Sequence, residues 1–262
     1  MRTHPWGTQA EMFGPRHEHR LSIILRETER LHSGARVLDA AVGLGQLAER
    51  LQQRGFRAFG IDAAFEAALH VRKNSSIPVV VGDLTRLPFR DRSFDGVTSG
   101  ETLEHLDNDA GAVQEIGRVL KRDGVCVATV PALRSLWSAS DDYYEHRRRY
   151  SREELSALFR NAGLSIEKAA YWGFPMVLTY DTLFLLPMNK RRAARSVESD
   201  AALQSVAQAG RSRALVAIVR AAFAVDWLFR FIPFGPGLLL VGRKDGERAS
   251  RPLSADRRLH LE

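Results

Sequence analysis

Residues 37–51 read VLDAAVGLGQLAERL, and this stretch decides the fold. An apolar run ends in Asp39, a turn containing Gly43 and Gly45 follows, and leucines then recur at helical spacing. Glycine lets the backbone turn tightly and approach a ligand without a Cβ in the way. A helix start also presents free N–H groups. The stretch therefore predicts a strand, a ligand-binding turn and a helix in succession.

The sequence on either side repeats this alternation. Short apolar runs occupy 35–40, 57–62, 78–83, 94–99 and 124–130, and helical patterns occupy 44–55, 64–74 and 109–124. A further helix is expected at 151–163, where Ser151 and Glu154 form a capping box, and further strands at 164–173 and 237–244. Strands that alternate with helices are typical of a parallel sheet covered by helices. We therefore predict an α/β fold with a Rossmann-like seven-stranded sheet.

The alternation breaks after Gly173, which suggests how the chain is organised. We expect a helical insertion before the last strand, and its apolar residues suit a lid over an apolar acceptor or a membrane-facing surface. The simpler alternative is that these helices only pack on the sheet edge. The predicted segments are an N-terminal cap at 1–34, a cofactor-binding core at 35–173, the insertion at 174–234, the last strand at 235–245 and a disordered tail at 246–262.

Composition narrows the class of protein. The single cysteine, Cys126, lies in an apolar run, so neither a disulfide framework nor a thiolate zinc site is expected. No apolar leader follows Met1 and no apolar run is long enough for a membrane helix, so we expect a cytoplasmic protein. Residues 189–262 hold 14 Lys and Arg against 7 Asp and Glu, which accounts for the net charge of +7. This basic segment suits peripheral contact with the inner membrane surface or with nucleic acid, or is simply a solvated face.

Three successive predicted strands end in an aspartate, namely Asp39, Asp62 and Asp83. Ligands of open α/β sheets bind in the crevice at the carboxyl ends of the strands. An acidic residue at the end of the second strand is placed to accept both hydroxyls of a ribose. A nicotinamide dinucleotide would fit the glycine turn and Asp62, but it would leave Asp83 and the run FDGV unexplained.

These motifs resemble those of the class I S-adenosylmethionine-dependent methyltransferases of type 11. The resemblance rests on VLDAAVGLGQ, GID, GDLTRLPFRDRSFDGV and LKRDGVCVATVP. It implies an enzyme that binds S-adenosylmethionine and releases S-adenosylhomocysteine, with the methionine moiety near Asp39, the ribose on Asp62 and the adenine on Asp83 and Leu84. The implied cofactor-binding residues are Asp39, Ala41, Gly43, Gly45, Asp62, Ala63, Asp83, Leu84 and Gly100. Ala41 stands where the family usually has its first glycine, and its methyl group is expected to crowd the cofactor.

The stretch ETLEH at 101–105 is the second candidate feature. In a helical turn, Glu101, Glu104 and His105 would share one face, which suits a metal site, acid–base chemistry or a polar helix start. A similar E-x-x-E-H occurs in small-RNA 2′-O-methyltransferases and ubiquinone-pathway O-methyltransferases. That resemblance implies Mg²⁺, Mn²⁺ or Zn²⁺ on Glu101, Glu104, His105 and His146. In other family members the stretch lines the pocket without a metal.

Without a metal, the candidate catalytic residues are His105, His146 and Glu101, because an imidazole titrates near neutrality. A run of arginines close to His146 would offer an anion clamp to the acceptor, or would be a solvated surface. The arginines are Arg147, Arg148, Arg149 and Arg152.

The expected reaction is O-methylation of a small or lipid-linked acceptor such as a sugar, a quinone precursor or a natural product. Two alternatives stay open. One is a metal-dependent RNA 2′-O-methyltransferase, and the other is a non-catalytic scaffold that binds the cofactor and exploits the Ala41 departure.

Overall fold

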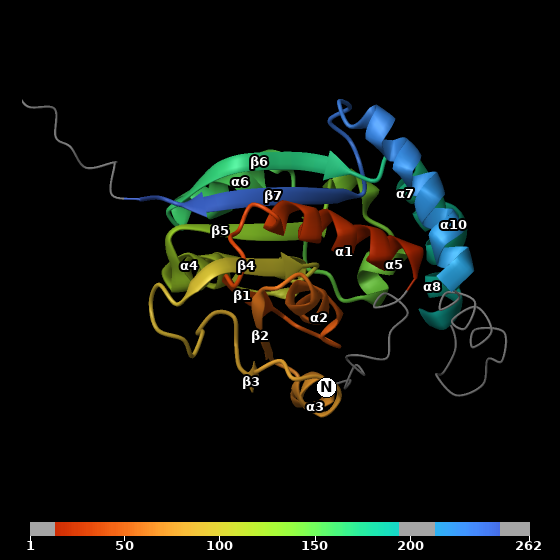
Figure 1. Cartoon of the computed structure of the whole chain (residues 1–262). Helices are drawn as coiled ribbons and strands as arrows, with labels where there is room; N and C mark the ends of the chain where they lie inside the picture. Colours follow the sequence, from red (N-terminus) through yellow and green to blue (C-terminus); the bar gives the residue numbers. More distant parts are fainter. Residues whose placement is uncertain (1–13, 194–212, 247–262) are drawn as a thin grey trace, which may run out of the picture.

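A computed structural model describes residues 14–193 and 213–246, and its centre is one seven-stranded sheet (Figure 1). The strand order is β3-β2-β1-β4-β5-β7-β6. Strands β1 to β5 pair in parallel, and β7 is antiparallel to both β5 and β6. This confirms the predicted Rossmann-like sheet. The strands are β1 Arg36–Ala40, β2 Arg57–Asp62, β3 Val79–Val81, β4 Phe94–Gly100, β5 Leu120–Pro131, β6 Leu164–Trp172 and β7 Gly237–Lys244.

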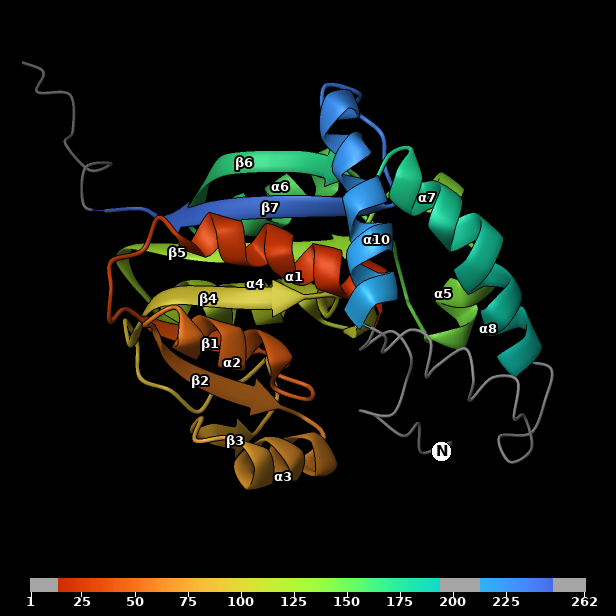
Figure 2. The same cartoon turned by 45° about the vertical axis from the view of Figure 1, so that its right-hand side comes forward.

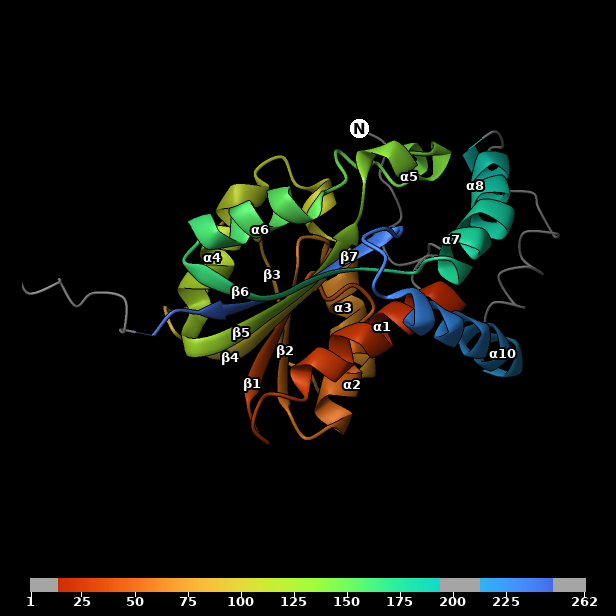
Figure 3. The same ribbon diagram turned by 90° about the horizontal axis from the view of Figure 1, so that it is seen from above.

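Helices cover both faces of the sheet, as the continuous apolar strands require (Figure 3). On one face lie α1 Pro15–Thr28, α2 Gln46–Gln53 and α3 Phe65–Asn74. On the other lie α4 Asp109–Val119 and α6 Arg152–Asn161, with the short helix α5 Ala139–Tyr143 beyond the strand ends. The capping box of α6 forms as predicted, because the Glu154 N–H donates to Ser151 Oγ at 3.2 Å and the Ser151 N–H donates to Glu154 Oε2 at 2.8 Å.

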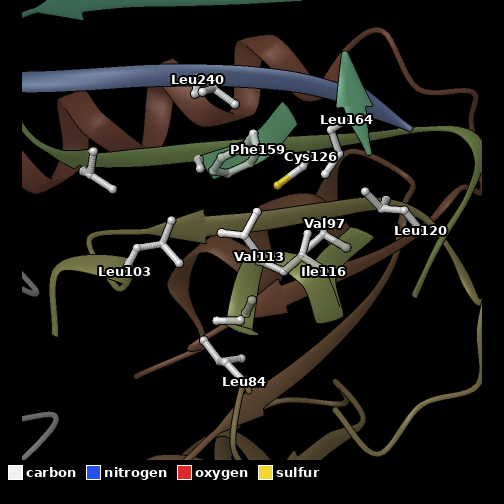
Figure 4. Close-up of a cluster of buried hydrophobic side chains, with 14 of the residues drawn as sticks. Leu84, Val97, Leu103, Val113, Ile116, Leu120, Cys126, Phe159, Leu164 and Leu240 are labelled. Atoms are coloured by element: carbon white, nitrogen blue, oxygen red, sulfur yellow. The ribbon is translucent and has the colours of Figure 1, made fainter. Parts of the chain in front are cut away.

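Each covered face has its own apolar core. Figure 4 shows part of the core beneath α4 and α6, where Val113, Ile116 and Phe159 pack against strand residues. Cys126 is buried in this core, and burial raises the pKa of its thiol to about 12. The thiol is therefore a packing group, in agreement with the interpretation drawn from the sequence.

Helix α4 ends earlier than predicted. The helical pattern extended to Gly124, but the helix ends at Val119 and Leu120 already pairs with Phe94 in the sheet. Leu120 is fully buried in the extended conformation, and sheet pairing overrides the local helical pattern.

Helices between β6 and β7 stand beyond the carboxyl edge of the parallel strands (Figures 1 and 2). They are α7 Met176–Tyr180, the π-helical η4 Asp181–Leu185, α8 Leu186–Ala193, α10 Arg213–Phe223 and the 3₁₀ turn η5 Ala224–Phe229. Within the described ranges, no helix has the length and apolar character needed to cross a bilayer. The expected disordered tail from residue 247 onward, and residues 1–13 of the expected cap, lie outside the described residues.

Candidate active site

The glycine turn after β1 is fixed to the neighbouring strand. The backbone N–H groups of Ala41 and Val42 both donate to the carbonyl of Ile61, at 3.0 and 2.9 Å. Ala41 has a positive φ of 70°, as Gly43 and Gly45 also do at 53° and 84°. An L-residue in this conformation costs roughly 1–2 kcal/mol, so Ala41 strains the turn in addition to carrying an extra methyl group.

Asp62 ends β2 beside this turn. Its Oδ2 accepts a hydrogen bond from the Gly43 N–H and its Oδ1 accepts one from the Ala64 N–H, each at 2.9 Å. Burial raises the pKa of Asp62, against the effect of these hydrogen bonds. A carboxylate has about four acceptor positions, so two oxygens anchored in this way keep capacity for two hydroxyl donors. The residues present therefore fit the ribose of S-adenosylmethionine.

Asp39 lies deeper at the end of β1 and is buried. Its Oδ1 accepts a hydrogen bond from Thr98 Oγ1 at 3.1 Å. Burial raises its pKa to about 7, and the neighbouring Asp62 carboxylate adds to the effect. A cationic ammonium group at this position would favour the ionised form, which suits the methionine end of the cofactor.

We expect Asp39 to make the stability of the ligand-free chain depend on pH. Between its ordinary pKa of 3.8 and about 7, the folded chain keeps a proton that the unfolded chain releases. The free energy of unfolding should therefore fall by about 1 kcal/mol per pH unit as pH rises through this window. Urea unfolding at pH 5, 6, 7 and 8 of the wild type and Asp39→Asn measures the difference. Parallel curves for the two proteins would contradict the expectation.

The other predicted cofactor residues lie at the same edge of the sheet. Asp83 follows β3 and its Oδ1 accepts a hydrogen bond from the Thr85 N–H at 2.8 Å, while Leu84 is buried. Ala63 follows Asp62 and is exposed. Gly100 ends β4, where an added Cβ would lie 3.2 Å from Ile24 of α1.

Glu101, Glu104 and His105 do not share a helical face, so that prediction is wrong. The 3₁₀ turn η2 covers only Leu103–His105, and Glu101 precedes it with a φ of 54°. Glu101 Oε2 instead lies 3.5 Å from Arg16 Nη1 and 3.7 Å from Arg20 Nη1. Burial alone would raise the pKa of Glu101, but Arg20, Arg16 and His146 outweigh it and hold the pKa below its ordinary value.

Glu104, His105 and His146 do come together. Their ligand atoms all lie within 4.8 Å of one another, and the two imidazole rings meet edge to face with centroids 4.9 Å apart. Two hydrogen bonds join the segments across about 40 residues, because the Arg147 N–H donates to the Glu104 carbonyl and Arg147 Nε donates to the His105 carbonyl, each at 2.8 Å.

The pKa values of Glu104 and His105 in this cluster are shifted from their ordinary values. Glu104 is fully buried, and among the described residues neither carboxylate oxygen has a hydrogen-bond partner. Burial, and then the Glu101 charge, raise the pKa of Glu104 well above its ordinary value. Burial, and then His146, lower the pKa of His105 to about 4. The cluster therefore combines a carboxyl group that burial favours in its protonated form with an imidazole that burial favours in its neutral form.

The Asp141 carboxylate holds the imidazole ring of His146 in place. Its Oδ1 lies 2.9 Å from His146 Nδ1 and accepts from Arg149 Nε at 2.7 Å, while its Oδ2 accepts from the Ser138 N–H at 2.8 Å. Asp141 is fully buried, yet the hydrogen bonds from His146 and Arg149 outweigh that burial and hold its pKa well below the ordinary value. With Nδ1 held by a carboxylate, His146 presents Nε2 as a proton acceptor.

The arginines close to His146 are engaged within the chain. Arg147 pairs with Asp107, Arg148 Nη1 lies 2.9 Å from Asp109 Oδ2, and Arg149 forks onto Asp141. The Arg152 guanidinium lies 5.4 Å from the centroid of the Tyr171 ring. These contacts argue against the predicted anion clamp.

Residues that sequence reasoning missed cover the site from α1 and the insertion. Arg16 Nε donates to Asp181 Oδ2 at 3.0 Å, which ties α1 to η4. His17 contacts Gln46 of α2 through Nε2, and Arg20 through Nδ1 at 2.9 Å. Arg16 and Arg20 stand four residues apart on one helix face, and this spacing is the signal that the sequence carried.

The sequence of the chain is similar to those of known methyltransferases. The family described as "Methyltransferase domain" matches residues 38–128. The "Probable S-adenosylmethionine-dependent methyltransferase" of Mycolicibacterium smegmatis is 28% identical over 169 residues, which are 63% of this chain and 64% of that protein. The demethylmenaquinone methyltransferase of Corynebacterium kroppenstedtii is 32% identical over 103 residues, which are 38% of this chain and 44% of that protein. The matched stretch thus covers less than two thirds of either relative's length.

A solved structure shares the fold over nearly the whole chain. One chain of the complex between the Trm112 methyltransferase activator of Haloferax volcanii and a methyltransferase superposes with a TM-score of 0.62. It is 22% identical, and the superposition covers 90% of this chain and 92% of that one. The expected family resemblance is confirmed: residues 38–128 belong to a methyltransferase domain of the class I S-adenosylmethionine-dependent family.

Proposed function

We propose that the chain transfers the methyl group of S-adenosylmethionine to an oxygen atom of a small or lipid-linked acceptor. The cofactor supplies a methyl group on a sulfonium, which an in-line nucleophile attacks. Asp39, Asp62 and the glycine turn hold and orient the cofactor at the carboxyl edge of the sheet. Glu104, His105 and His146 follow strands β4 and β5 at the same edge, where they face the acceptor side.

The observation that carries this proposal is the Asp141–His146 pair. An imidazole whose Nδ1 is held by a buried carboxylate is oriented to take the proton of an acceptor hydroxyl on Nε2. Burial and the neighbouring His146 lower the pKa of His105 to about 4, so His105 serves as a neutral neighbour of His146. We therefore assign the general base to His146.

The acceptor class is tested by direct assay. Labelled S-adenosylmethionine is incubated with the full chain and with quinone precursors, sugars, long-chain hydroxy compounds or RNA bearing free 2′-hydroxyls. Quinone precursors are included because a demethylmenaquinone methyltransferase is among the relatives. Turnover on a small or lipid-like hydroxyl supports the proposal. Turnover on RNA alone would replace it, and cofactor binding without turnover on any acceptor would favour a non-catalytic scaffold.

We expect Asp62→Asn to weaken binding of S-adenosylhomocysteine by about 10- to 100-fold. The amide loses one charge-assisted acceptor for a ribose hydroxyl, which is worth roughly 1.5–3 kcal/mol. Isothermal titration measures the dissociation constant. Glu66→Gln, at an exposed position on the nearby helix α3, is the matched control and should bind as the wild type does. Equal affinity in Asp62→Asn and the control would mean that Asp62 does not bind the ribose.

A divalent cation on Glu104, His105 and His146 is a second candidate, favoured by the unpartnered oxygens of the buried Glu104 among the described residues. One carboxylate and two imidazoles suit Zn²⁺ or Mn²⁺ better than Mg²⁺. Ligand atoms around zinc lie roughly 3.3 Å apart, so ligand atoms now up to 4.8 Å apart must approach by up to about 1.5 Å. Glu101 faces arginines instead and falls outside this set. When bound, such a cation would lower the pKa of an acceptor hydroxyl.

We expect Glu104→Gln to abolish metal binding if this cation site exists. Titration of metal-stripped protein with Zn²⁺ and with Mn²⁺ provides the measurement, and proton release on binding is a second readout, because a metal binds the ionised carboxylate whereas burial raises the pKa of Glu104. Glu145→Gln, exposed and next to His146, is the control. Equal binding by the two variants, or no binding by the wild type, would end the metal candidate and leave His146 as the base.

A further inference from the structure

The end of the insertion carries an exposed apolar surface, which we call the apolar tip. It consists of Val225, Trp227, Leu228 and Phe231, in η5 and the turn after it. Trp227 is 58% exposed, Leu228 59% and Phe231 79%. Large side chains clustered and exposed to this extent mark a surface that contacts something apolar.

The charges around the apolar tip have one sign. Asp226 is the single acidic residue between positions 216 and 237, and it points inward, where its two oxygens accept the N–H groups of Met176 at 2.6 Å and Val177 at 3.2 Å. The Arg230 guanidinium lies 4.3 Å from the centroid of the Trp227 ring. The exposed charge at the tip is therefore positive, which complements an anionic surface.

The residue types of the apolar tip and its place in the fold both favour the same kind of partner, a lipid surface. Tryptophan and arginine both have an apolar part and a polar end, and they are favoured where hydrocarbon meets lipid headgroups. The tip stands at the end of α10 remote from residue 213, and the described chain ends at residue 246, at the opposite end of β7 (Figures 1 and 2).

We infer that the apolar tip docks on an anionic lipid bilayer. The tip lies on the side of the sheet where β7 begins opposite Pro131, which is the carboxyl edge that carries the site. Docking would turn that edge toward the bilayer, so an acceptor could pass from the membrane to the site. The passage of an acceptor from the membrane to the site rests on the proposed function, whereas the docking of the tip on the bilayer does not.

The tip is also connected to the site. Asp226 caps α7. The centroid of the Phe223 ring lies 5.5 Å from those of the His19 and Tyr180 rings. Asp181, which follows Tyr180 in the chain, pairs with Arg16. Arg16 in turn faces Glu101. A continuous series of side-chain contacts therefore joins the tip to the rim of the site.

Vesicle co-sedimentation of the full chain, without cofactor or acceptor, tests the docking. The vesicles are phosphatidylcholine alone or phosphatidylcholine with about one third phosphatidylglycerol. We expect wild-type binding to the anionic vesicles, and at least ten-fold weaker binding for the triple variant Trp227→Ser, Leu228→Ser and Phe231→Ser. The double variant Phe65→Ser and Val81→Ser, which changes exposed apolar residues of α3 and β3, should bind as the wild type does. Unfolding midpoints establish that each variant is folded.

Each other outcome overturns the inference. Equal binding by the triple variant would assign the membrane contact to basic segments elsewhere in the chain. Absence of wild-type binding, together with a dimer that the triple variant loses, would make the tip an interface between two copies. Because no step of this measurement uses methyl transfer, its failure is distinguishable from failure of the proposed function. Conversely, the triple variant should retain wild-type turnover on a water-soluble acceptor.

Discussion

His146→Ala is expected to lower kcat for O-methylation by about 100- to 10,000-fold while leaving the affinity for S-adenosylhomocysteine unchanged. The imidazole removed is the one whose Nδ1 is held 2.9 Å from the buried Asp141 carboxylate. Without it, the acceptor hydroxyl must lose its proton to water. Steady-state kinetics with the acceptor identified by the assay above gives kcat, and titration gives the affinity.

His70→Ala, at an exposed position on α3, is the control for His146→Ala and should keep wild-type kcat. An unchanged kcat in His146→Ala would take the base away from this residue. The same kinetics after chelation separates the two candidates. Wild-type activity that resists a chelator supports His146 as the base, and activity lost with the metal and restored by Zn²⁺ or Mn²⁺ supports the cation.

Asp141→Ala is expected to lower the free energy of unfolding by about 3–5 kcal/mol, because it removes a fully buried carboxylate that pairs with the half-buried Arg149 side chain. The carboxylate accepts hydrogen bonds from Arg149 at 2.7 and 2.9 Å and caps α5 through Ser138. Urea unfolding monitored by circular dichroism provides the measurement.

The neighbouring variant Asp142→Ala serves as the control. Asp142 is exposed and accepts one hydrogen bond, from Trp137 Nε1 at 2.9 Å, so its removal should cost about 1 kcal/mol or less. A loss of similar size in both variants would mean that Asp141 is not the electrostatic centre of this segment. Asp141→Asn, which keeps the shape, should lie between the two.

The fold could be predicted because its signals are local. The run 57–62 ends in Asp62 and the run 237–244 contains the apolar stretch LLLV, and both become strands with these limits. The capping box at Ser151 likewise needs only four residues of sequence to be recognised. These local predictions agree with the structure because sheet pairing and packing favour the same conformation that the local pattern favours.

The site was harder to predict because its contacts are long-range and its backbone is irregular. The left-handed conformation of Glu101 removes it from the helical face that the spacing of ETLEH suggested. Its partners Arg16 and Arg20 come from a helix about 80 residues earlier, and Asp181 comes from the insertion. Asp141 had a readable signal, the capping box that begins at Ser138, but nothing in the sequence stated that its carboxylate would also hold His146.

β7 lies between β5 and β6 in the sheet but is synthesised after both, and this order affects how fast the sheet can form. β5, from Val125 to Pro131, and β6 flank β7 and pair with it, while their residues are made about 70 to 120 positions earlier. As the chain emerges, these two strands therefore keep open hydrogen-bonding edges until residues 237–244 arrive. Contacts so distant in sequence slow folding, and unpaired edges invite association with other chains. A nascent chain of this protein thus exposes these two strand edges until β7 has been translated.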